Sequence, residues 1–235
     1  MHYRIYPLGD NALNIDWGNR IDEVTNREVL TLWERLRQAR LPGVNDLIPA
    51  YSSLSVIFDA NELLRQSPGQ LPYQTMRKLV AQALNAPFEM SNVSGREIRI
   101  PVCYDPAMAP DLPGLAARSG LSHDQIIQLH TAREYRVYML GFLPGFPYMG
   151  TVDERIATPR RAEPRPRVPA GSVGIAGAQT GIYPLESPGG WNLIGRTPLR
   201  LFDLYSTEPT LLQPGDRVHF YAISPEQFHQ IRAGS

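Results

Sequence analysis

The first part of the chain alternates between strand-like and helix-like spacing of hydrophobic residues. Apolar side chains at every second position predict half-buried strands, and apolar side chains three and four apart predict helices. The predicted elements, in order, are a strand at 13–17, a helix at 22–40, strands at 44–48 and 54–58, a helix at 72–84 and a strand at 96–102. This β-α-β-β-α-β order predicts a small ferredoxin-like α/β domain in residues 1–90.

A second domain is predicted for residues 95–225. A cluster of Pro, Asn, Ser and Gly at 85–95 is typical of a boundary. Beyond it, the pattern predicts a helix at 112–118, a helix that starts at the capping box of Ser122 and Gln125, and strands at 134–140, 199–203 and 217–222. With further short strands between 141 and 198, this half has enough strands to close a β-barrel. The expected fold class is therefore α+β.

The segment 141–198 has the most unusual composition in the chain. It holds ten glycines and nine prolines, yet it also holds Phe142, Phe146, Tyr148, Tyr183 and Trp191. Disordered segments lack such apolar content. We therefore predict a folded surface of tight turns and short strands, in which glycine permits close backbone approach and proline stiffens the loops. A surface of this kind is typical of a binding site.

Composition excludes several classes of function. The formal net charge of the 235 residues is zero, which argues against nucleic-acid and anionic-membrane partners. The only lysine, Lys78, lies in a predicted helix, so no P-loop is present. The histidines show no metal-ligand spacing, and no metal is expected. A single cysteine, Cys103, and no apolar run long enough to span a membrane predict a cytoplasmic protein.

Two groups of residues remain as candidates for chemistry. His130 lies at the end of a predicted helix, where it is either a catalytic group or a helix C-terminal cap. Five arginines between 155 and 167 lie among prolines, and guanidinium groups suit carboxylate and phosphate recognition. Ligand binding and partner binding both fit this cluster, with a solvated loop as the third interpretation.

Several ordered motifs resemble those of the family of 5-oxoprolinase B subunits, which is also called KipI-like or allophanate hydrolase subunit 1. The matching segments are Tyr138–Tyr148, Pro159–Arg165, Val168–Val173, Gln179–Pro184, Ser187–Trp191, Gly195–Pro198 and Pro214–Val218. The resemblance covers the whole second half of the chain. It implies a cyclophilin-like β-barrel at about 95–225, preceded by the small α/β domain.

The resemblance also implies an activity that several subunits share. Together with an obligate C subunit, plus an A subunit, such a chain converts 5-oxo-L-proline, ATP and water to L-glutamate, ADP and phosphate. ATP is then a co-substrate of the complex, no cofactor is covalently bound, and the chain alone is expected to be inactive. Two alternatives remain open: a KipI-like inhibitor of a sensor histidine kinase, and a biotin-dependent carboxyltransferase module that acts on urea or allophanate.

Site residues follow from residue type and position within these motifs. His130 and Gln179 are the candidate catalytic residues, for proton transfer and for holding the lactam or an oxyanion. The candidates for substrate and anion binding are Tyr148, Arg160, Arg165, Tyr183, Gly189 and Gly190. In this hypothesis the arginines bind phosphate or carboxylate, the tyrosines form walls, and the glycines offer backbone amides.

Overall fold

The computed structural model describes residues 3–19, 21–86 and 95–234. The chain divides into two compact units, residues 1–93 and 94–235. The predicted boundary at 85–95 lies mostly outside the described residues, at 87–94. The predicted fold class, a small α/β domain followed by a β-barrel domain, is confirmed.

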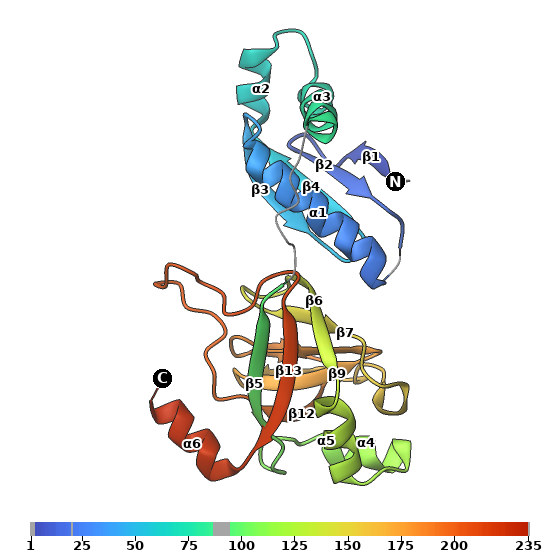
Figure 1. Cartoon of the computed structure of the whole chain (residues 1–235), viewed down its shortest axis with the longest axis vertical. Coiled ribbons are helices and arrows are strands. Elements are labelled where there is room, and N and C mark those ends of the chain that lie inside the picture. The colour runs from blue at the N-terminus through green and yellow to red at the C-terminus, as the bar shows by residue number, and fades with distance from the viewer. Residues whose placement is uncertain (1–2, 20, 87–94, 235) are drawn as a thin grey trace. The chain divides into compact units, whose positions relative to one another are not determined.

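The first unit is a four-stranded antiparallel sheet with helices packed on it (Figure 1). Its strands are β1 (Arg4–Pro7), β2 (Ala12–Asp16), β3 (Val44–Pro49) and β4 (Ser53–Phe58). Its helices are α1 (Glu23–Ala39), α2 (Ala60–Gln66) and α3 (Pro72–Asn85). In β4, Leu54, Val56 and Phe58 are buried, while the alternate residues are half-buried. The strand therefore turns one apolar face to the core that it shares with α1 and α3.

The edge of this sheet differs from the prediction. The order is β1-β2-β4-β3, so the place beside β2 is taken by the N-terminal strand β1. The segment 96–102 completed the predicted β-α-β-β-α-β order, but it falls within the predicted second domain, and it forms β5 (Glu97–Cys103) of the barrel. Strand alternation is the same in either sheet, which is why the pattern could not assign the partner.

The second unit is a closed barrel of seven strands in the order β10-β7-β6-β13-β5-β12-β9. Besides β5, these are β6 (Glu134–Leu140), β7 (Pro147–Gly150), β9 (Ser172–Ala176), β10 (Gln179–Ile182), β12 (Asn192–Arg196) and β13 (Arg217–Ile223). Strands β5 and β13 pair in parallel, and the other pairs are antiparallel. Outside the barrel, β8 (Arg165–Val168) and β11 (Ser187–Gly189) form a separate two-stranded ribbon.

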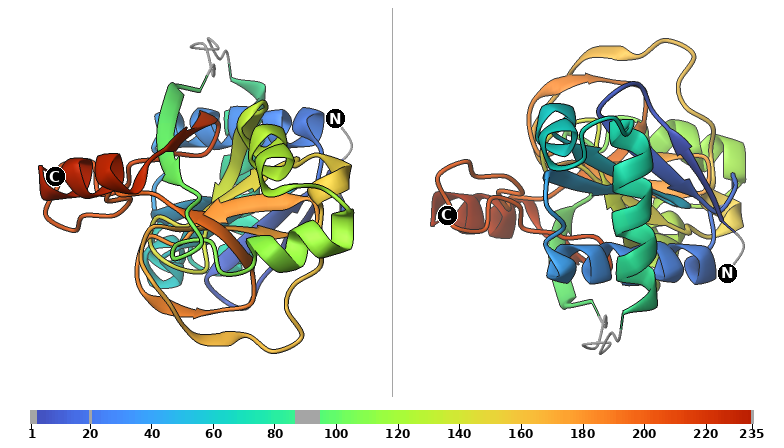
Figure 2. Two further views of the ribbon diagram at one scale, coloured as in Figure 1. Left: turned by 90° about the horizontal axis from the view of Figure 1, so that it is seen from below. Right: turned by 90° about the horizontal axis from the view of Figure 1, so that it is seen from above.

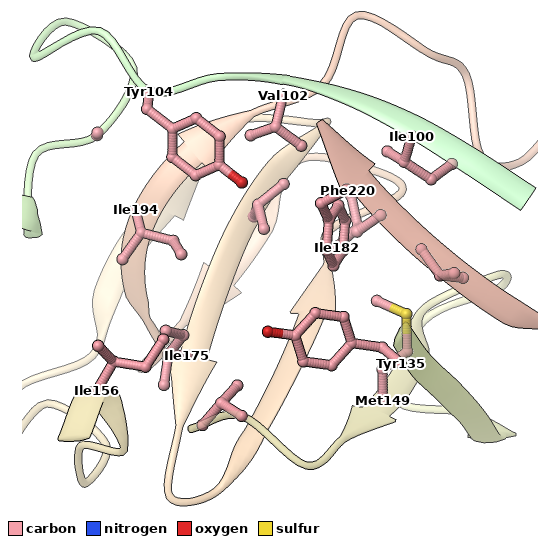
Figure 3. Close-up of a cluster of buried hydrophobic side chains, with 14 of the residues drawn as sticks. Ile100, Val102, Tyr104, Tyr135, Met149, Ile156, Ile175, Ile182, Ile194 and Phe220 are labelled. Carbon is pink, nitrogen blue, oxygen red and sulfur yellow. The ribbon is translucent and has the colours of Figure 1, made fainter. Parts of the chain in front are cut away.

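Aliphatic and aromatic side chains fill the barrel interior (Figure 3). Val173, Ile175 and Ile182 point inward from β9 and β10, and Phe220 points inward from β13. At the crossing of β12 and β5 the strands approach so closely that a Cβ at Gly195 would lie 2.6 Å from Val102 Cγ1. Only glycine fits there.

Helices flank the barrel on two sides. The pair α4 (Leu112–Ser119) and α5 (His123–Thr131) lies on one side, and α6 (Pro225–Ala233) lies on the opposite side (Figure 2, left). A short 3-10 helix, η1, spans Glu154–Ile156. No helix among residues 3–19, 21–86 and 95–234 is long and apolar enough to cross a membrane.

The Gly/Pro-rich segment folds as predicted, because β7 to β12 all lie within it. The predicted strand at 199–203 is wrong, since the structure has only an isolated bridge there, between Phe202 and Thr210. Helix α6 was not predicted, although Ser224 and Gln227 form a capping box at its start. The second unit therefore includes a helix beyond residue 225.

Candidate functional site

Glycines on the outer face of the barrel make room for a cluster of aromatic rings. Gly174 of β9 and Gly181 of β10 are cross-strand partners. A Cβ at Gly181 would lie 2.9 Å from Phe146 Cζ and 3.0 Å from Trp191 Cζ3, and a Cβ at Gly174 would lie 3.0 Å from Trp191 Cβ. The rings of Phe146 and Trp191 therefore lie directly on the backbone of these two strands, with centroids 5.4 Å apart.

Gln179 and Tyr148 share this outer face. Gln179 and Gly181 lie two residues apart on β10, so they point to the same side of the sheet. Gly181 is opposite Tyr148 of β7, and Gln179 is opposite Gly150. Both predicted side chains are half-buried. The structure therefore brings these two candidates together.

The predicted pair Gly189 and Gly190 lies above Tyr183. A Cβ at Gly189 would overlap the Tyr183 hydroxyl, so glycine is required for this packing. The Gly190 carbonyl accepts a 2.8 Å hydrogen bond from the Arg161 N–H, which ties the turn to residues 158–167, the arginine segment. Tyr183 itself is 1% exposed. Tyr183 was predicted to form a wall of the site, but its ring is buried against the Gly189–Gly190 turn.

Arg160 is exposed at the edge of this face. Burial raises the pKa of the Tyr148 hydroxyl, and the positive charge of Arg160 offsets part of that rise. Burial also raises the pKa of the Tyr183 hydroxyl, and the charge of Arg160 again offsets part of the rise. Hydrogen bonds between the backbones of Thr158 and Gly177 fix the start of the arginine segment beside the β9–β10 turn.

Arg165 was predicted to bind an anion at the site, but its side chain is turned toward Asp111 instead. Its Nη1 and Nη2 atoms form a bidentate pair with Asp111, at 2.8 and 2.7 Å. Arg161 Nη1 binds the same carboxylate at 2.8 Å, and the Leu193 N–H donates to it at 2.7 Å. Asp111 is 8% exposed, so this carboxylate is a buried anchor that holds β8 and the arginine segment against β12 and the start of α4. Arg165 therefore has a structural role here.

His130 also lies away from the other candidates. It is fully buried in the barrel interior, where its Nδ1 is 2.8 Å from the Tyr104 hydroxyl and its Nε2 is 3.1 Å from Thr180 Oγ1. Its ring stacks on Phe220, with a centroid distance of 4.5 Å. The Tyr104 hydroxyl points into this interior (Figure 3). Burial lowers the pKa of His130 to about 3, so the ring is neutral. This position fits a structural side chain that satisfies polar groups in the core, and not proton transfer at the outer face.

Sequence reasoning missed three residues next to the site. Asp111 precedes a short helix and has the sequence signature of an N-cap, but its side chain makes no capping hydrogen bond. Arg118 lies in the last turn of α4, and Asn192 begins β12. Together with Arg160 and Arg161, the last two line a pocket of about 370 Å³. Only the tertiary fold brings α4 to the arginine segment, so no local signal could have found them. The described residues contain no group of three or more His, Cys, Asp or Glu that could hold a metal ion.

Comparison with known proteins identifies the family. The family model described as carboxyltransferase domain, subdomain C and D, matches residues 3–212. The 5-oxoprolinase B subunit of Bacillus subtilis (strain 168) is 43% identical over 237 residues, which cover 100% of this chain and 99% of that protein. The chain belongs to the family of 5-oxoprolinase B subunits. The resemblance seen in the sequence motifs is thereby confirmed.

Solved structures agree with this assignment. The crystal structure of TTHA0988 has a TM-score of 0.78 and 41% sequence identity, and the match covers 91% of this chain and 40% of that one. This chain therefore corresponds to about two-fifths of TTHA0988. The Kluyveromyces lactis urea carboxylase matches 98% of this chain and 22% of its own length, with a TM-score of 0.74 and 20% identity. That likeness establishes a shared fold.

Proposed function

We propose that this chain is the B subunit of an ATP-dependent 5-oxoprolinase, and that together with the A and C subunits it converts 5-oxo-L-proline to L-glutamate. The observation that carries the proposal is the 43% identity, over essentially the full length of both chains, with a 5-oxoprolinase B subunit. The outer face of the barrel supports it, because Tyr148, Gln179, Arg160 and the Gly189–Gly190 turn lie together there.

The proposed chemistry requires donors and positive charge around an activated lactam. A lactam resists hydrolysis, and transfer of a phosphoryl group to its oxygen makes the ring carbon electrophilic. Arg160 is placed to neutralise the phosphoryl or carboxylate charge, and Gln179 to donate a hydrogen bond to the lactam or to the developing oxyanion. Arg165 and His130 are left out of this scheme, since Arg165 pairs with Asp111 and His130 is sealed in the barrel.

The test is ATP-coupled release of glutamate by the complex reconstituted from this chain and the A and C subunits. We expect Arg160→Ala and Gln179→Ala each to lower kcat/KM by roughly 100-fold, the usual effect of removing one donor from a developing negative charge. Arg167→Ala is the matched control, because Arg167 is an exposed arginine of the same segment that pairs with Glu186 at 2.6 Å.

The proposal also predicts a requirement for all three proteins. This chain alone should release no glutamate, and each omission from the complex should abolish turnover. A complex that forms normally but produces no glutamate from 5-oxoproline and ATP would refute the proposed function. Near-normal turnover by Arg160→Ala and Gln179→Ala in an intact complex would refute only the roles assigned to these two residues.

A further inference from the structure

A polar pocket lies beside the aromatic cluster, between α4 and the arginine segment. Its volume is about 370 Å³. The lining residues are Arg118, Pro159, Arg160, Arg161, Ala162, Glu163 and Asn192. They come from the last turn of α4, from the loop before β8 and from the start of β12. The fold thus collects three guanidinium groups around one depression from two separate parts of the chain.

Two of these guanidinium groups have no carboxylate partner among the described residues. Asp111 forms ion pairs with both Arg161 and Arg165. Arg118 and Arg160, by contrast, form no ion pair within 4 Å with any residue that the structure describes. Glu163 is the one acidic residue of the lining, and it pairs with neither of them. The pocket therefore keeps an excess of positive charge.

Asn192 holds Arg118 toward the pocket. The Asn192 side chain is 3% exposed, and its Nδ2 donates to the Pro159 carbonyl at 2.8 Å and to the Ile175 carbonyl at 3.2 Å. These two bonds fix the amide so that Oδ1 accepts from Arg118 Nη2 at 3.4 Å. An arginine near a helix C-terminus is favourable in itself. The buried amide of Asn192 orients the Arg118 side chain in addition, and this is independent of the helix end.

We propose that this pocket binds a phosphate oxyanion between Arg118 and Arg160. One guanidinium fork can bind both oxygens of a planar carboxylate, as Arg165 does at Asp111, where Arg161 Nη1 and the Leu193 N–H donate in addition. Two forks held on different segments can instead bind several oxygens of a tetrahedral group at once. The two sources of that group are free phosphate and the terminal phosphate of a nucleotide. The inference deepens the proposed function, and its biological meaning rests on it.

Calorimetric titration of the full chain with inorganic phosphate, ADP and acetate at constant ionic strength tests this inference without turnover. We expect phosphate or ADP to bind more tightly than acetate, and Arg118→Ala and Arg160→Ala each to weaken that binding roughly tenfold. Arg167→Ala is again the control and should bind as the unmodified chain does. Tighter binding of ADP than of phosphate identifies the nucleotide as the source, and tighter binding of phosphate than of ADP identifies free phosphate.

The result that overturns the inference is equally direct. Binding of neither phosphate nor ADP, unchanged binding in both pocket variants, or a preference for acetate would each remove the phosphate site. Both side chains are exposed, so the variants should keep the thermal unfolding midpoint of the unmodified chain, which excludes misfolding as the cause. Arg118→Ala has no part in the test of the proposed function. Failure of phosphate and ADP to bind therefore counts against the phosphate site and not against the proposed 5-oxoprolinase function, whereas a chain that binds phosphate without supporting turnover contradicts only the proposed function.

Discussion

The buried His130 should make the barrel sensitive to acid. Its pKa in the folded chain is about 3, because burial penalises the charged ring, against 6.5 for an unperturbed histidine. Between these two values the unfolded chain binds a proton that the folded chain does not. Stability is therefore highest above about pH 6.5 and falls as the pH drops toward 3. Each pKa unit corresponds to about 1.4 kcal/mol, so His130 alone should remove about 2 kcal/mol between pH 7 and pH 5.

The perturbation that isolates this effect is His130→Gln, which removes the titrating ring but keeps a polar side chain. Urea unfolding of both proteins at several pH values gives the comparison. Trp191 reports on the barrel when Trp17 and Trp33, which belong to the first unit, are replaced by Phe. We expect the free energy of unfolding of the His130→Gln variant to vary less with pH, by about 2 kcal/mol over this range. Equal slopes for the two proteins would mean that the folded state protonates His130 readily, and would refute its assignment as a sealed core residue.

Two further predictions concern the outer face and its anchor. Gly181→Ala should destabilise the barrel by about 1–3 kcal/mol, because its Cβ would press on Phe146 and Trp191, whereas Gly114→Ala, where a Cβ meets nothing within 4 Å, should be neutral or slightly stabilising in the same unfolding assay. Asp111→Ala should lower the free energy of unfolding by about 2 kcal/mol by leaving two arginines unpaired, and unchanged stability would contradict its role as an anchor.

Local signals predicted the elements that are stabilised by nearby residues. The helix predicted at 22–40 is α1, Glu23–Ala39, and the helix predicted at 72–84 is α3, Pro72–Asn85. The strand predicted at 134–140 has the observed bounds of β6. Periodicity and capping residues act within one or two turns, so they are readable from sequence. Strand partners are chosen over long distances, which explains why the β-α-β-β-α-β pattern counted β5 with the strands of the first domain.

The site was predicted only in part for the same physical reason. Gly/Pro richness located the surface, because close backbone approach needs special residues at fixed positions. It did not reveal which side chains are free. Arg160 and Arg165 look equivalent in sequence, yet a carboxylate 54 residues away from Arg165 takes that guanidinium and leaves the other exposed.

The two faces of strand β10 separate His130 from the residues of the proposed site, so His130 cannot be the proton-transfer group of the proposed reaction. Gln179 lies on the outer face, whereas its neighbour Thr180 is bonded to His130 inside the barrel. Among the residues that line the pocket, Glu163 is the one carboxylate and so the candidate general base on this chain. Glu163 is exposed, and we expect another protein of the complex to supply the base.

The variant Glu163→Gln distinguishes a general base on this chain from a general base on another protein of the complex. In the reconstituted complex, kcat should stay within about threefold of the unmodified value, because the base is not on this chain. Phosphate binding to the isolated variant should become tighter, since a negative charge beside Arg160 is removed. A fall in kcat of about 100-fold, together with loss of the acidic limb of the pH–rate profile, would instead place the base on Glu163.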